Sequence, residues 1–542
     1  SMSFSVHFNP SQTGIYSDTL MLFNNDPDDH VKYITLEGSA VTCIPGGIIQ
    51  QDTRWIKENS PYFIQDHLAL DLGTKLTLEP GVIVIFEETA GLTIDGHLIA
   101  LGKENDSIIF AGENENTFEH ITFRDSSNVS IEYFIVKGSG IAIHNTETAL
   151  RKGVICNGHN IGIDINDGVA SLSDIEIYGF TDHGVHASRS ASNYELKIND
   201  CAIHDNGHYG IYMESNYGYD SLIIRNSDIY NHGNDGIYAF NMRQNSYILE
   251  NNIYNNQNRG LHVRYIYNAS VFFQKNRIHK NAYGIYIGVY CRSNAAIRQN
   301  LIYNNINDGI SLMRSKNIVK KNDIYNNRGD GIKIRDNAGS YFDYLPEITH
   351  NNIYFNHGKE LNVQHESGGI IDAQYNFWGV TDSLSIAEEI TDYYDNISSA
   401  RADFSNWLNG KVASEPIQRF SAKTLKGGQI KLSWKKHYKA SDYLLYSNNG
   451  AGEVDTNLVY KSLDSSYTQY IDTLPAGQYK FKIRIRDYQG QLGPFSYCTG
   501  LSDDKSPDFV SAYSVKGMDS IVVAFDERLD PYLALDTNNW TI

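Results

Sequence analysis

The sequence predicts an all-β protein whose largest part is a solenoid of short stacked coils. Three observations predict this class. The 542-residue chain has 44 Gly and 38 Tyr but only 11 Pro, and glycine suits frequent turns while tyrosine suits half-buried strands. Apolar and polar residues alternate in short runs, which is strand periodicity. A pattern of the form Asn-x-Ile-Tyr-x-Asn, followed by glycine, recurs about every 25 residues in the middle of the chain.

The repeat is built on an isoleucine and a glycine. The glycine follows the isoleucine by seven residues in most repeats; Gly284 follows after six, and Glu360 replaces the last glycine. Each repeat has room for three short strands, exemplified by 222–224, 229–230 and 237–240. Coils stacked about 4.8 Å apart bury their inward apolar residues in one column. The repeat isoleucines are Ile155, Ile177, Ile203, Ile229, Ile253, Ile278, Ile302, Ile324 and Ile353.

The two ends of this region carry a family resemblance. It opens with Pro61-Tyr62-Phe63-Ile64, followed by 76–82 and 92–96, and it closes with Asn376-Phe377-Trp378-Gly379. Together with the repeats, residues 59–410 resemble a right-handed parallel β-helix of the pectate-lyase-like superfamily, with about 12 coils. The resemblance implies the fold but no single activity, because many activities occur on this fold.

The flanking segments resemble β-sandwich modules. Residues 1–42 resemble part of an immunoglobulin-like domain found beside bacterial surface anchors, and 43–58 are expected to form a linker. Residues 411–500 resemble a fibronectin type III domain, with Trp434 in its core and Tyr479 as its corner tyrosine. Residues 501–542 are expected to begin another immunoglobulin-like domain. Such strings of modules are typical of bacterial secreted or cell-surface proteins, which is the location we expect.

Charge and hydropathy limit the partners. The formal net charge of −19 disfavours binding to a nucleic-acid backbone, and no apolar run is long enough to predict a membrane span. We expect a monomer. Calcium is the one cofactor considered, at the acidic runs 26–29 and 503–504, but neither run has a recognised calcium-loop pattern and ordinary solvated turns are the favoured interpretation.

Two rows of side chains are expected to be uniform from coil to coil. One is an outward aromatic row, interpreted as a stacking ladder that supports coil pairing or, alternatively, as a platform for sugar rings. The other is an inward row of asparagines that hydrogen-bond within a turn. The aromatic row is Tyr178, His204, Tyr230, Tyr254, His279, Tyr303, Tyr325 and Tyr354; the asparagine row is Asn226, Asn252, Asn276, Asn300, Asn322 and Asn352.

The strand after each glycine differs, because its outward residues change from coil to coil. The first outward row is Ala142, Asp164, His186, Tyr212, Tyr238, His262, Tyr286, Ser311, Lys333 and Asn362. The second is His144, Asn166, Ser188, Glu214, Phe240, Arg264, Gly288, Met313, Arg335 and Gln364. The resemblance implies that a polysaccharide lies along this sheet. The excess of basic residues over acidic ones in these rows points to an acidic polysaccharide.

Specific roles follow for individual residues of these rows. The expected substrate-binding residues are Asp164, His186, Tyr212, Tyr286, Lys333 and Arg335, with the tyrosines, Tyr238 included, stacking on sugar rings and the basic groups meeting carboxylates or sulfates. A lyase needs a base, here His262 or Tyr238, and a cation, here Arg264. A hydrolase needs two carboxylates; Asp164 and Glu214 are about two coils, ~10 Å, apart, so Asp235 is the better partner for Glu214.

Neither catalytic set matches a family signature, so a non-catalytic interpretation stays open. The coils are short, whereas enzymes of this fold usually have long loops that wall a cleft. The alternatives are therefore a polysaccharide lyase or glycoside hydrolase on one side, and a glycan-binding adhesin or structural spacer of a large surface protein on the other.

Overall fold

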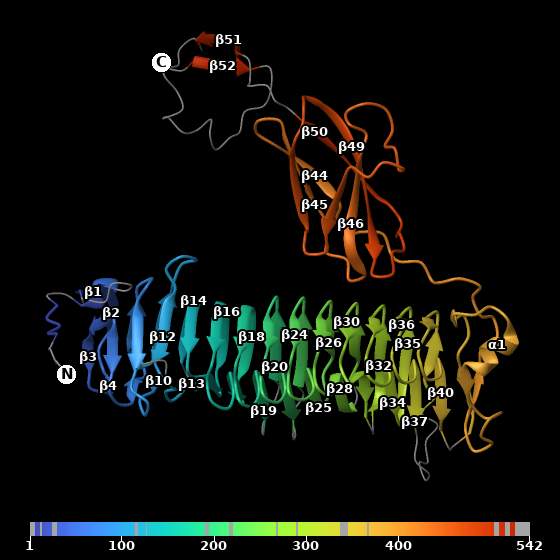
Figure 1. Cartoon of the computed structure of the whole chain (residues 1–542), viewed down its shortest axis with the longest axis horizontal. Helices are drawn as coiled ribbons and strands as arrows, with labels where there is room; N and C mark the ends of the chain where they lie inside the picture. The colour runs from blue at the N-terminus through green and yellow to red at the C-terminus, as the bar shows by residue number, and fades with distance from the viewer. Residues whose placement is uncertain are drawn as a thin grey trace. The chain divides into compact units, whose positions relative to one another are not determined.

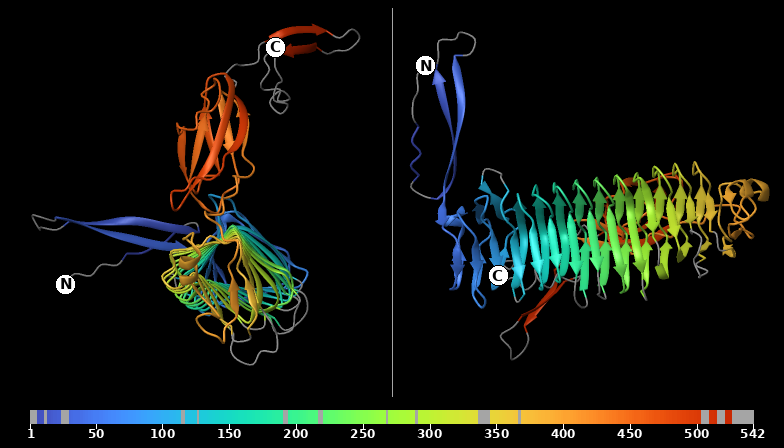
Figure 2. Two further views of the ribbon diagram at one scale, coloured as in Figure 1. Left: turned by 90° about the vertical axis from the view of Figure 1, so that its right-hand side faces the viewer. Right: turned by 90° about the horizontal axis from the view of Figure 1, so that it is seen from below.

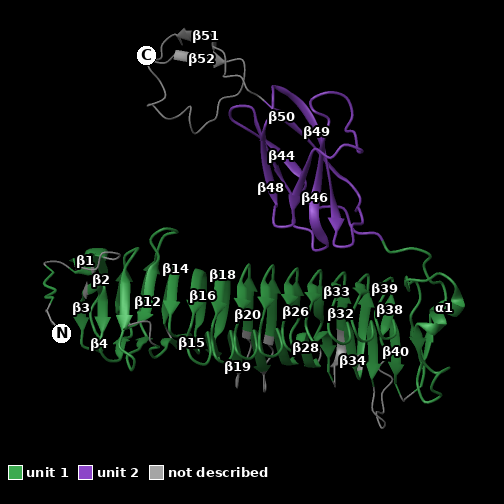
Figure 3. Ribbon diagram, in the orientation of Figure 1, with its two compact units in different colours: residues 1–412 green, residues 413–542 purple. Residues whose placement is uncertain are grey.

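The computed structural model divides into two compact units, residues 1–412 and 413–542 (Figure 3). Each unit is described by itself. The described residues are 6–10, 13–23, 30–113, 117–125, 127–189, 194–215, 220–266, 269–288, 291–335, 345–365, 368–502, 509–514 and 521–525.

The first unit is a parallel β-solenoid, in which strands of successive coils lie side by side (Figures 1 and 2). One wall is a 15-stranded parallel sheet with one strand per coil, which confirms the predicted parallel solenoid. Its strands, in spatial order, are β4 (Gly47–Ile49), β7 (Leu68–Leu70), β10 (Leu92–Ile94), β13 (Ile121–Arg124), β15 (Ile141–His144), β17 (Ile163–Asn166), β19 (Val185–Arg189), β22 (Ile211–Ser215), β25 (Ile237–Met242), β28 (Arg259–Ile266), β31 (Tyr283–Ile287), β34 (Ile310–Met313), β37 (Ile332–Arg335), β40 (Leu361–Gln364) and β42 (Ile390–Thr391).

In most coils the rest of the chain contributes two strands to a second parallel sheet; in three coils these two are continuous, as β14 (Asn128–Lys137), β16 (Glu147–Cys156) and β18 (Val169–Tyr178). In one of the other coils the two strands are β23 (Asp220–Arg225) and β24 (Asp228–Tyr230), followed by β25 of the first sheet. The predicted three strands per coil are therefore confirmed for most coils. The repeat isoleucines are completely buried, and with the other inward Ile, Leu and Val side chains they form one continuous core. Burial of this column is what stabilises the stack, because no single coil can bury its own apolar face.

The coils bend through residues with positive φ, and from Asn251 onward an inward asparagine follows the bend. Asn276 shows the arrangement: its backbone N–H and its Nδ2 both donate to Asn300 Oδ1 of the next coil at 3.0 Å, and Nδ2 also donates to Ile248 O at 2.8 Å. Two such ladders run along the stack. The first is Asn251, Asn276, Asn300, Asn322, Asn351 and Asn376, and the second is Asn256, Asn281, Asn305, Asn327 and Asn356.

The predicted asparagine row is wrong at three of its six positions. Asn226 lies at the bend itself, with φ of 51°, and it is the next residue, Ser227, whose backbone N–H donates to Asn251 Oδ1 of the ladder. Likewise Asn251 and Asn351 take the places predicted for Asn252 and Asn352. The left-handed residue shifts the alternation of the strand, so the inward position falls one residue away from where simple counting puts it. The second ladder was not predicted.

The predicted aromatic row forms one stack of eight rings. Neighbouring ring centroids lie 4.7–5.3 Å apart and the ring planes differ by 2–17°. The stack is more deeply buried toward its C-terminal end, where Tyr354 is 2% exposed and the ammonium of Lys411 lies 4.0 Å from its ring centroid. Every ring in the interior of the stack therefore has both faces covered by its neighbours.

The solenoid begins earlier than predicted. Residues 43–58, expected to be a linker, contain β3 (Thr42–Ile44), β4 and β5 (Thr53–Trp55), which pair in parallel with strands of the next coil. This segment lacks the repeat pattern, yet its backbone completes the edge of both sheets. Before it, β1 (Gly14–Phe23) and β2 (Val31–Ala40) form an antiparallel pair; the immunoglobulin-like assignment of 1–42 stays a prediction.

The C-terminal end of the solenoid is closed by the predicted Asn-Phe-Trp-Gly segment and a short helix. Asn376 ends the first asparagine ladder, and Trp378 is 1% exposed in the core. Ile386 of α1 (Ser383–Glu388) joins the same core. Within the described residues, no helix is long and apolar enough to cross a membrane.

The second unit contains two antiparallel sheets with one shared hydrophobic core. The first sheet has β44 (Ser421–Leu425), β45 (Gln429–Ser433) and β48 (Gln469–Thr473); the second has β46 (Ala440–Ser447), β47 (Lys461–Asp464), β49 (Gly477–Asp487) and β50 (Ser496–Ser502). Trp434 and Tyr479 are buried in the core, and the Tyr479 hydroxyl donates to Pro475 O at 3.0 Å. The fibronectin type III assignment stays a prediction. Further along, β51 (Phe509–Ser514) pairs with β52 (Ile521–Phe525).

Candidate functional site

The outer face of the 15-stranded sheet carries the two predicted rows of varied side chains. We call this surface the varied face and define it by the outward residues of β15 to β40. The strand register aligns the first row from Ala142 to Asn362 without a break. The register also aligns Glu214 with Phe240 and Phe240 with Arg264 in the second row. Both rows therefore lie where the sequence predicted.

A third row on this face was missed. It consists of the residue just before the repeat glycine, and backbone hydrogen bonds or strand pairing stack these residues from coil to coil. The signal was present in the sequence, because this position also changes chemically from coil to coil. Apart from Asp235, which was predicted as a partner of Glu214, sequence reasoning followed only the residues after the glycine. The row is His183, Tyr209, Asp235, Arg259, Tyr283, Asp308, Asp330 and Lys359.

Asp235, His262 and Arg259 form a polar group on the varied face in which the acid and the imidazole are buried. His262 Nδ1 lies 2.8 Å from Asp235 Oδ2, and the exposed fractions of the two side chains are 7% and 1%. Arg259 donates its backbone N–H to Asp235 Oδ1 at 2.8 Å, and its guanidinium lies 3.6 Å from the same carboxylate. Burial lowers the pKa of His262, although the Asp235 hydrogen bond opposes this. The ring is therefore neutral at pH 7, with its proton on Nδ1 and a lone pair on Nε2.

Other charged groups of the face are also paired. His186 Nδ1 lies 2.8 Å from Asp164 Oδ1. Burial would raise the pKa of Asp164, but the hydrogen bond and charge of His186 dominate and the pKa is lowered. Lys333 Nζ lies 2.9 Å from Asp330 Oδ2. Much of the expected positive excess is thus balanced by carboxylates, several of which come from the row that was missed.

Tyrosine and histidine rings stand side by side across the middle of the face. Tyr212 and Tyr238 have centroids 5.2 Å apart and planes 14° apart, and the Tyr212 hydroxyl donates to Glu214 at 2.7 Å. The Arg259 guanidinium lies 4.5 Å from the Tyr286 ring centroid. These ring faces are covered by protein atoms, so the predicted face-on stacking of sugars on Tyr212 and Tyr238 does not fit this arrangement. The row offers ring edges and hydroxyl groups instead.

The N-terminal end of this aromatic cluster contains a group of nitrogen and oxygen donors. Asp182 Oδ1 lies 3.0 Å from His183 Nδ1 and 3.2 Å from His208 Nδ1. The two imidazole rings are stacked with centroids 5.2 Å apart. Burial lowers the pKa of His183 to about 4, so this ring is neutral at pH 7. None of these three residues was predicted.

The other predicted residues are less constrained. Arg264 follows His262 by two residues on the same strand. Burial raises the pKa of Tyr238, and the charge and a side-chain hydrogen bond of Arg264 oppose this rise. Arg335 is exposed. The acidic runs at 26–29 and 503–504, considered for calcium, lie outside the described residues.

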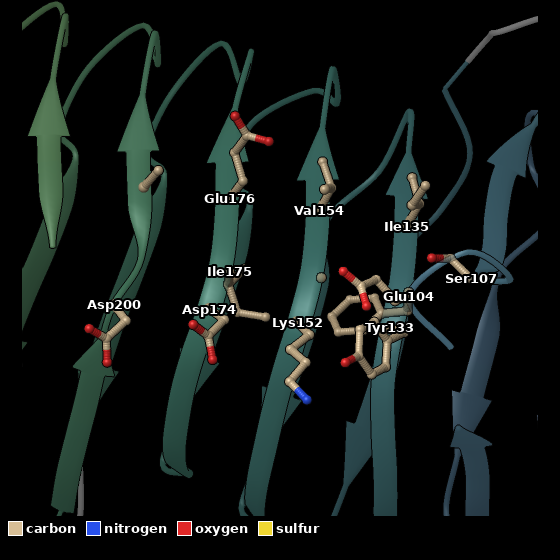
Figure 4. Close-up of a pocket in the computed structure, with 13 residues that line it drawn as sticks. Glu104, Ser107, Tyr133, Ile135, Lys152, Val154, Asp174, Ile175, Glu176 and Asp200 are labelled. Carbon is tan, nitrogen blue, oxygen red and sulfur yellow. The ribbon is translucent and has the colours of Figure 1, made fainter. Parts of the chain in front are cut away.

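A pocket of about 440 Å³ lies over the other sheet, across β14 (Asn128–Lys137), β16 (Glu147–Cys156) and β18 (Val169–Tyr178). Figure 4 shows Glu104, Asp174 and Asp200 around it, together with Lys152. Lys152 is already paired with Glu132 at 2.7 Å. Sequence reasoning did not predict this pocket. Gly153, which has no side chain, is one of the residues that line it.

Similarities to individual known proteins are limited to a short segment or to low sequence identity. The chain is 31% identical over 93 residues to Protein bark beetle of Drosophila melanogaster; the match covers 17% of this chain and only 3% of that relative. Among solved structures, the periplasmic alginate epimerase AlgG is 13% identical over 75% of this chain and 100% of its own, with a TM-score of 0.33.

Two further structures are similar at the same level. The A-module of mannuronan C-5 epimerase AlgE6 from Azotobacter vinelandii is 14% identical over 70% of this chain and 92% of its own, with a TM-score of 0.26. Pectate lyase Pel9A is 14% identical over 68% and 79%, with a TM-score of 0.26. None of these similarities assigns a role to a residue of this chain.

The family comparison is broader. The model described as a right-handed β-helix region matches residues 82–241, 139–288, 192–344 and 265–376 in overlapping segments. Together these segments span residues 82–376, which is more than half of the chain. The match agrees with the parallel sheets, the buried isoleucine column and the coil-to-coil ladders, and the chain belongs to the right-handed β-helix family.

Proposed function

We propose that this protein binds an acidic polysaccharide along the varied face. The observation that carries the proposal is the unbroken series of ring edges, hydroxyls, imidazoles and charged groups on adjacent coils from β17 to β31. Coils repeat at about 4.8 Å, so an extended polymer lying along the stack meets a new set of side chains at each coil. Polyhydroxylated ligands suit such a surface, because each ring edge is accompanied by a hydrogen-bonding group.

Two arginines support an acidic ligand. Arg264 and Arg335 stand in the second outward row, and their neighbours in register are uncharged: Phe240 beside Arg264, Met313 and Gln364 beside Arg335. An arginine whose neighbours in the same row carry no carboxylate is suited to bidentate recognition of a carboxylate or sulfate on a ligand. His186, His262 and Lys333, by contrast, already have acidic partners.

The binding proposal is tested with a panel of pectin, alginate, glycosaminoglycans and sulfated algal glycans. We expect saturable binding of at least one acidic glycan and at least a tenfold loss of affinity in Arg264→Ala combined with Tyr212→Ala. Tyr254→Phe, in the aromatic stack of the other sheet, is the matched control and should bind like the unmodified protein. Binding to no member of the panel, or equal binding by the double variant, would refute the proposal.

A second candidate function is cleavage by β-elimination, and the Asp235–His262 pair favours it. Neutral His262 can take the proton next to the uronate carboxyl group through Nε2, while Asp235 holds Nδ1–H and stabilises the imidazolium that forms. The electron pair of that C–H bond forms the new C=C bond, the bond to the leaving glycosidic oxygen breaks, and that oxygen takes up a proton. Arg264 is positioned to stabilise the charge that develops on the carboxylate.

This step has a structural requirement. His262 Nε2 is buried and has no hydrogen-bond partner, and the rings of Tyr238 and Tyr286 flank the imidazole at 4.7 and 5.0 Å. The ligand must therefore displace one of these two rings before Nε2 becomes reachable. Asp235 contacts His262 and Arg259, so in the lyase scheme it is a positioning residue. In a hydrolase, Asp235 would instead be the second catalytic carboxylate, acting together with Glu214.

Cleavage is tested by product analysis on the same glycans. New reducing ends together with ultraviolet-absorbing unsaturated products indicate elimination, whereas reducing ends alone indicate hydrolysis. For a lyase we expect His262→Ala to lower the rate at least 100-fold, and Asp235→Asn to lower kcat more than it raises KM. The control is His279→Tyr. This substitution puts tyrosine, the residue found at most positions of the aromatic stack, in place of His279. Binding without any cleavage would leave the protein a non-catalytic glycan-binding protein.

A further inference from the structure

We propose that Asp182, His183 and His208 form a binding site for a divalent transition metal, with Zn²⁺ as the best-fitting ion. The three side chains come from two successive coils and lie at the end of the varied face. Their ligand atoms all lie within 4.8 Å of one another, and among the described residues they are the one group of three His, Cys, Asp or Glu side chains that converge in this way.

The distances between the donor atoms fit a tetrahedral ion. A Zn²⁺ ion with ligands at about 2.0–2.1 Å has neighbouring donors about 3.3 Å apart. The two oxygen–nitrogen distances here are 3.0 and 3.2 Å. Two imidazole nitrogens and one carboxylate oxygen favour zinc over calcium, which prefers six to eight oxygen ligands. Three protein ligands leave the fourth position open for water or for an oxygen atom of a ligand.

The hydrogen bonds around His183 argue for a cation. The backbone N–H of Tyr209 points to His183 Nδ1 at 3.4 Å, which assigns a lone pair to that nitrogen. Nδ1 and Asp182 Oδ1 are then two acceptors 3.0 Å apart. Two lone pairs at this distance repel each other unless a positive centre lies between them. A metal ion bound to both atoms removes this conflict; it takes the single Nδ1 lone pair in place of the Tyr209 N–H, whose 3.4 Å contact is long for a hydrogen bond.

His208 has the support that a metal ligand needs. The Asn234 side-chain amide lies 2.9 Å from His208 Nε2, so one ring nitrogen is held while Nδ1 faces Asp182. The nearer amide atom is Asn234 Nδ2, which donates to Nε2, so without a metal the ring proton is on Nδ1 and faces Asp182. A metal at Nδ1 displaces that proton, and Nε2 then carries the ring proton; the Asn234 amide, flipped together with that of Asn258, accepts it. The side chains of Asp182 and His208 are 44% and 45% exposed, which gives an ion a path from solvent.

Two other acid–histidine pairs on the same face show why this cluster is different. His186 and Asp164 form a satisfied pair at 2.8 Å. At Asp235 and His262 the third group is the Arg259 guanidinium, which is a donor and repels a metal ion. Only at Asp182 does a second imidazole nitrogen supply the third acceptor.

The site is tested on the full untagged chain after treatment with a chelator. Titration with Co²⁺ is followed by its visible absorption, and titration with Zn²⁺ by calorimetry; neither measurement needs an activity. We expect one saturable site per chain, and at least tenfold weaker binding in His208→Ala and in Asp182→Asn. Both side chains are half-exposed, so these variants should fold, which the melting temperature checks.

The matched control is His159→Ala. His159 is exposed and lies in the corresponding turn of the preceding coil, and this variant should bind Co²⁺ like the unmodified protein. No saturable binding up to about 1 mM would overturn the proposal. So would equal Co²⁺ affinity in His208→Ala and the unmodified chain, since the metal would then sit elsewhere. Neither metal titration depends on glycan binding, so the metal site and the proposed glycan-binding function can each be refuted without affecting the other.

Discussion

Two aromatic rows run along the same solenoid, and they differ in what covers them. In the row from Tyr178 to Tyr354, neighbouring rings stack nearly parallel, with planes 2–17° apart. On the varied face, the angles between neighbouring rings of the first outward row range from 14° to 88°, and carboxylates, arginines and histidines lie among them. In a uniform row, the rings of neighbouring coils pack on one another and no ligand is needed to explain the row. A varied row contains side chains that coil-to-coil packing alone does not require.

The largest expected effect concerns the uniform interior. Asn300→Ala removes the acceptor for the backbone N–H and Nδ2 of Asn276, and it removes the donor to Phe273 O. Because these groups are buried, we expect a loss of about 2–5 kcal/mol in the free energy of unfolding. Denaturant unfolding of the full chain measures it. Asn252→Ala, at a position wrongly predicted to belong to the ladder, should cost less; an equal loss would contradict the ladder assignment.

The uniform aromatic stack should matter for stability but not for binding. Tyr303 is 7% exposed and stacks on His279 and Tyr325 at 4.8 and 5.2 Å. We expect Tyr303→Ala to destabilise the protein by about 3 kcal/mol and to leave glycan affinity unchanged. Tyr238→Ala on the varied face should show the opposite pattern. If both variants lose stability and binding together, the two rows do not have separate roles.

A third prediction concerns Glu360, which replaces the repeat glycine in the last coil. Its Oε1 accepts the backbone N–H of Asn356, and its Oε2 accepts Asn356 Nδ2, so it ends the second asparagine ladder. Burial raises its pKa to about 7, although the Asn356 hydrogen bonds oppose this. A carboxyl group whose pKa is higher in the folded state stabilises the fold at low pH, and that stabilisation is lost as pH rises from about 4.5 to 7.

The measurement is the stability of the chain across this pH range. We expect the contribution of Glu360 to fall by roughly 2–3 kcal/mol between pH 4.5 and 7. Glu360→Gln keeps the shape and an acceptor oxygen but does not titrate, so the variant should be less dependent on pH over this interval. An identical pH profile for both proteins would show that Glu360 titrates near its ordinary pKa.

The smallest expected effect is the loss of a single hydroxyl on the varied face. Tyr212→Phe removes the hydrogen bond to Glu214 but keeps the ring stack. We expect a change of about 1 kcal/mol or less in unfolding free energy and a two- to fivefold loss of glycan affinity. Tyr230→Phe in the uniform stack is the comparison, and equal binding losses in both would argue against a ligand on the varied face.

The sequence by itself determined the repeat, the inward isoleucines, the three strands per coil and the alignment of the two outward rows. These features depend on a period of two within strands and a nearly constant coil length, and both can be counted along the chain. The asparagine ladder was misplaced at Asn226, Asn252 and Asn352, because one left-handed residue at each bend changes which side chain faces inward. The extent of the solenoid was also misjudged, since residues 42–58 pair through their backbone without carrying the repeat.

Only the tertiary structure decided which charges meet on the varied face. Asp235 lies 27 residues before His262 in the chain, yet the two are hydrogen-bonded; Asp182 lies 26 residues before His208, yet its Oδ1 is 3.2 Å from His208 Nδ1. One coil of the solenoid separates them in sequence and one strand spacing separates them in space. Local patterns show which residues point outward, but contacts between coils depend on the length and shape of every turn between them. That is why Asp164 and Asp235 were predicted as site residues while their pairing with His186 and His262 was not.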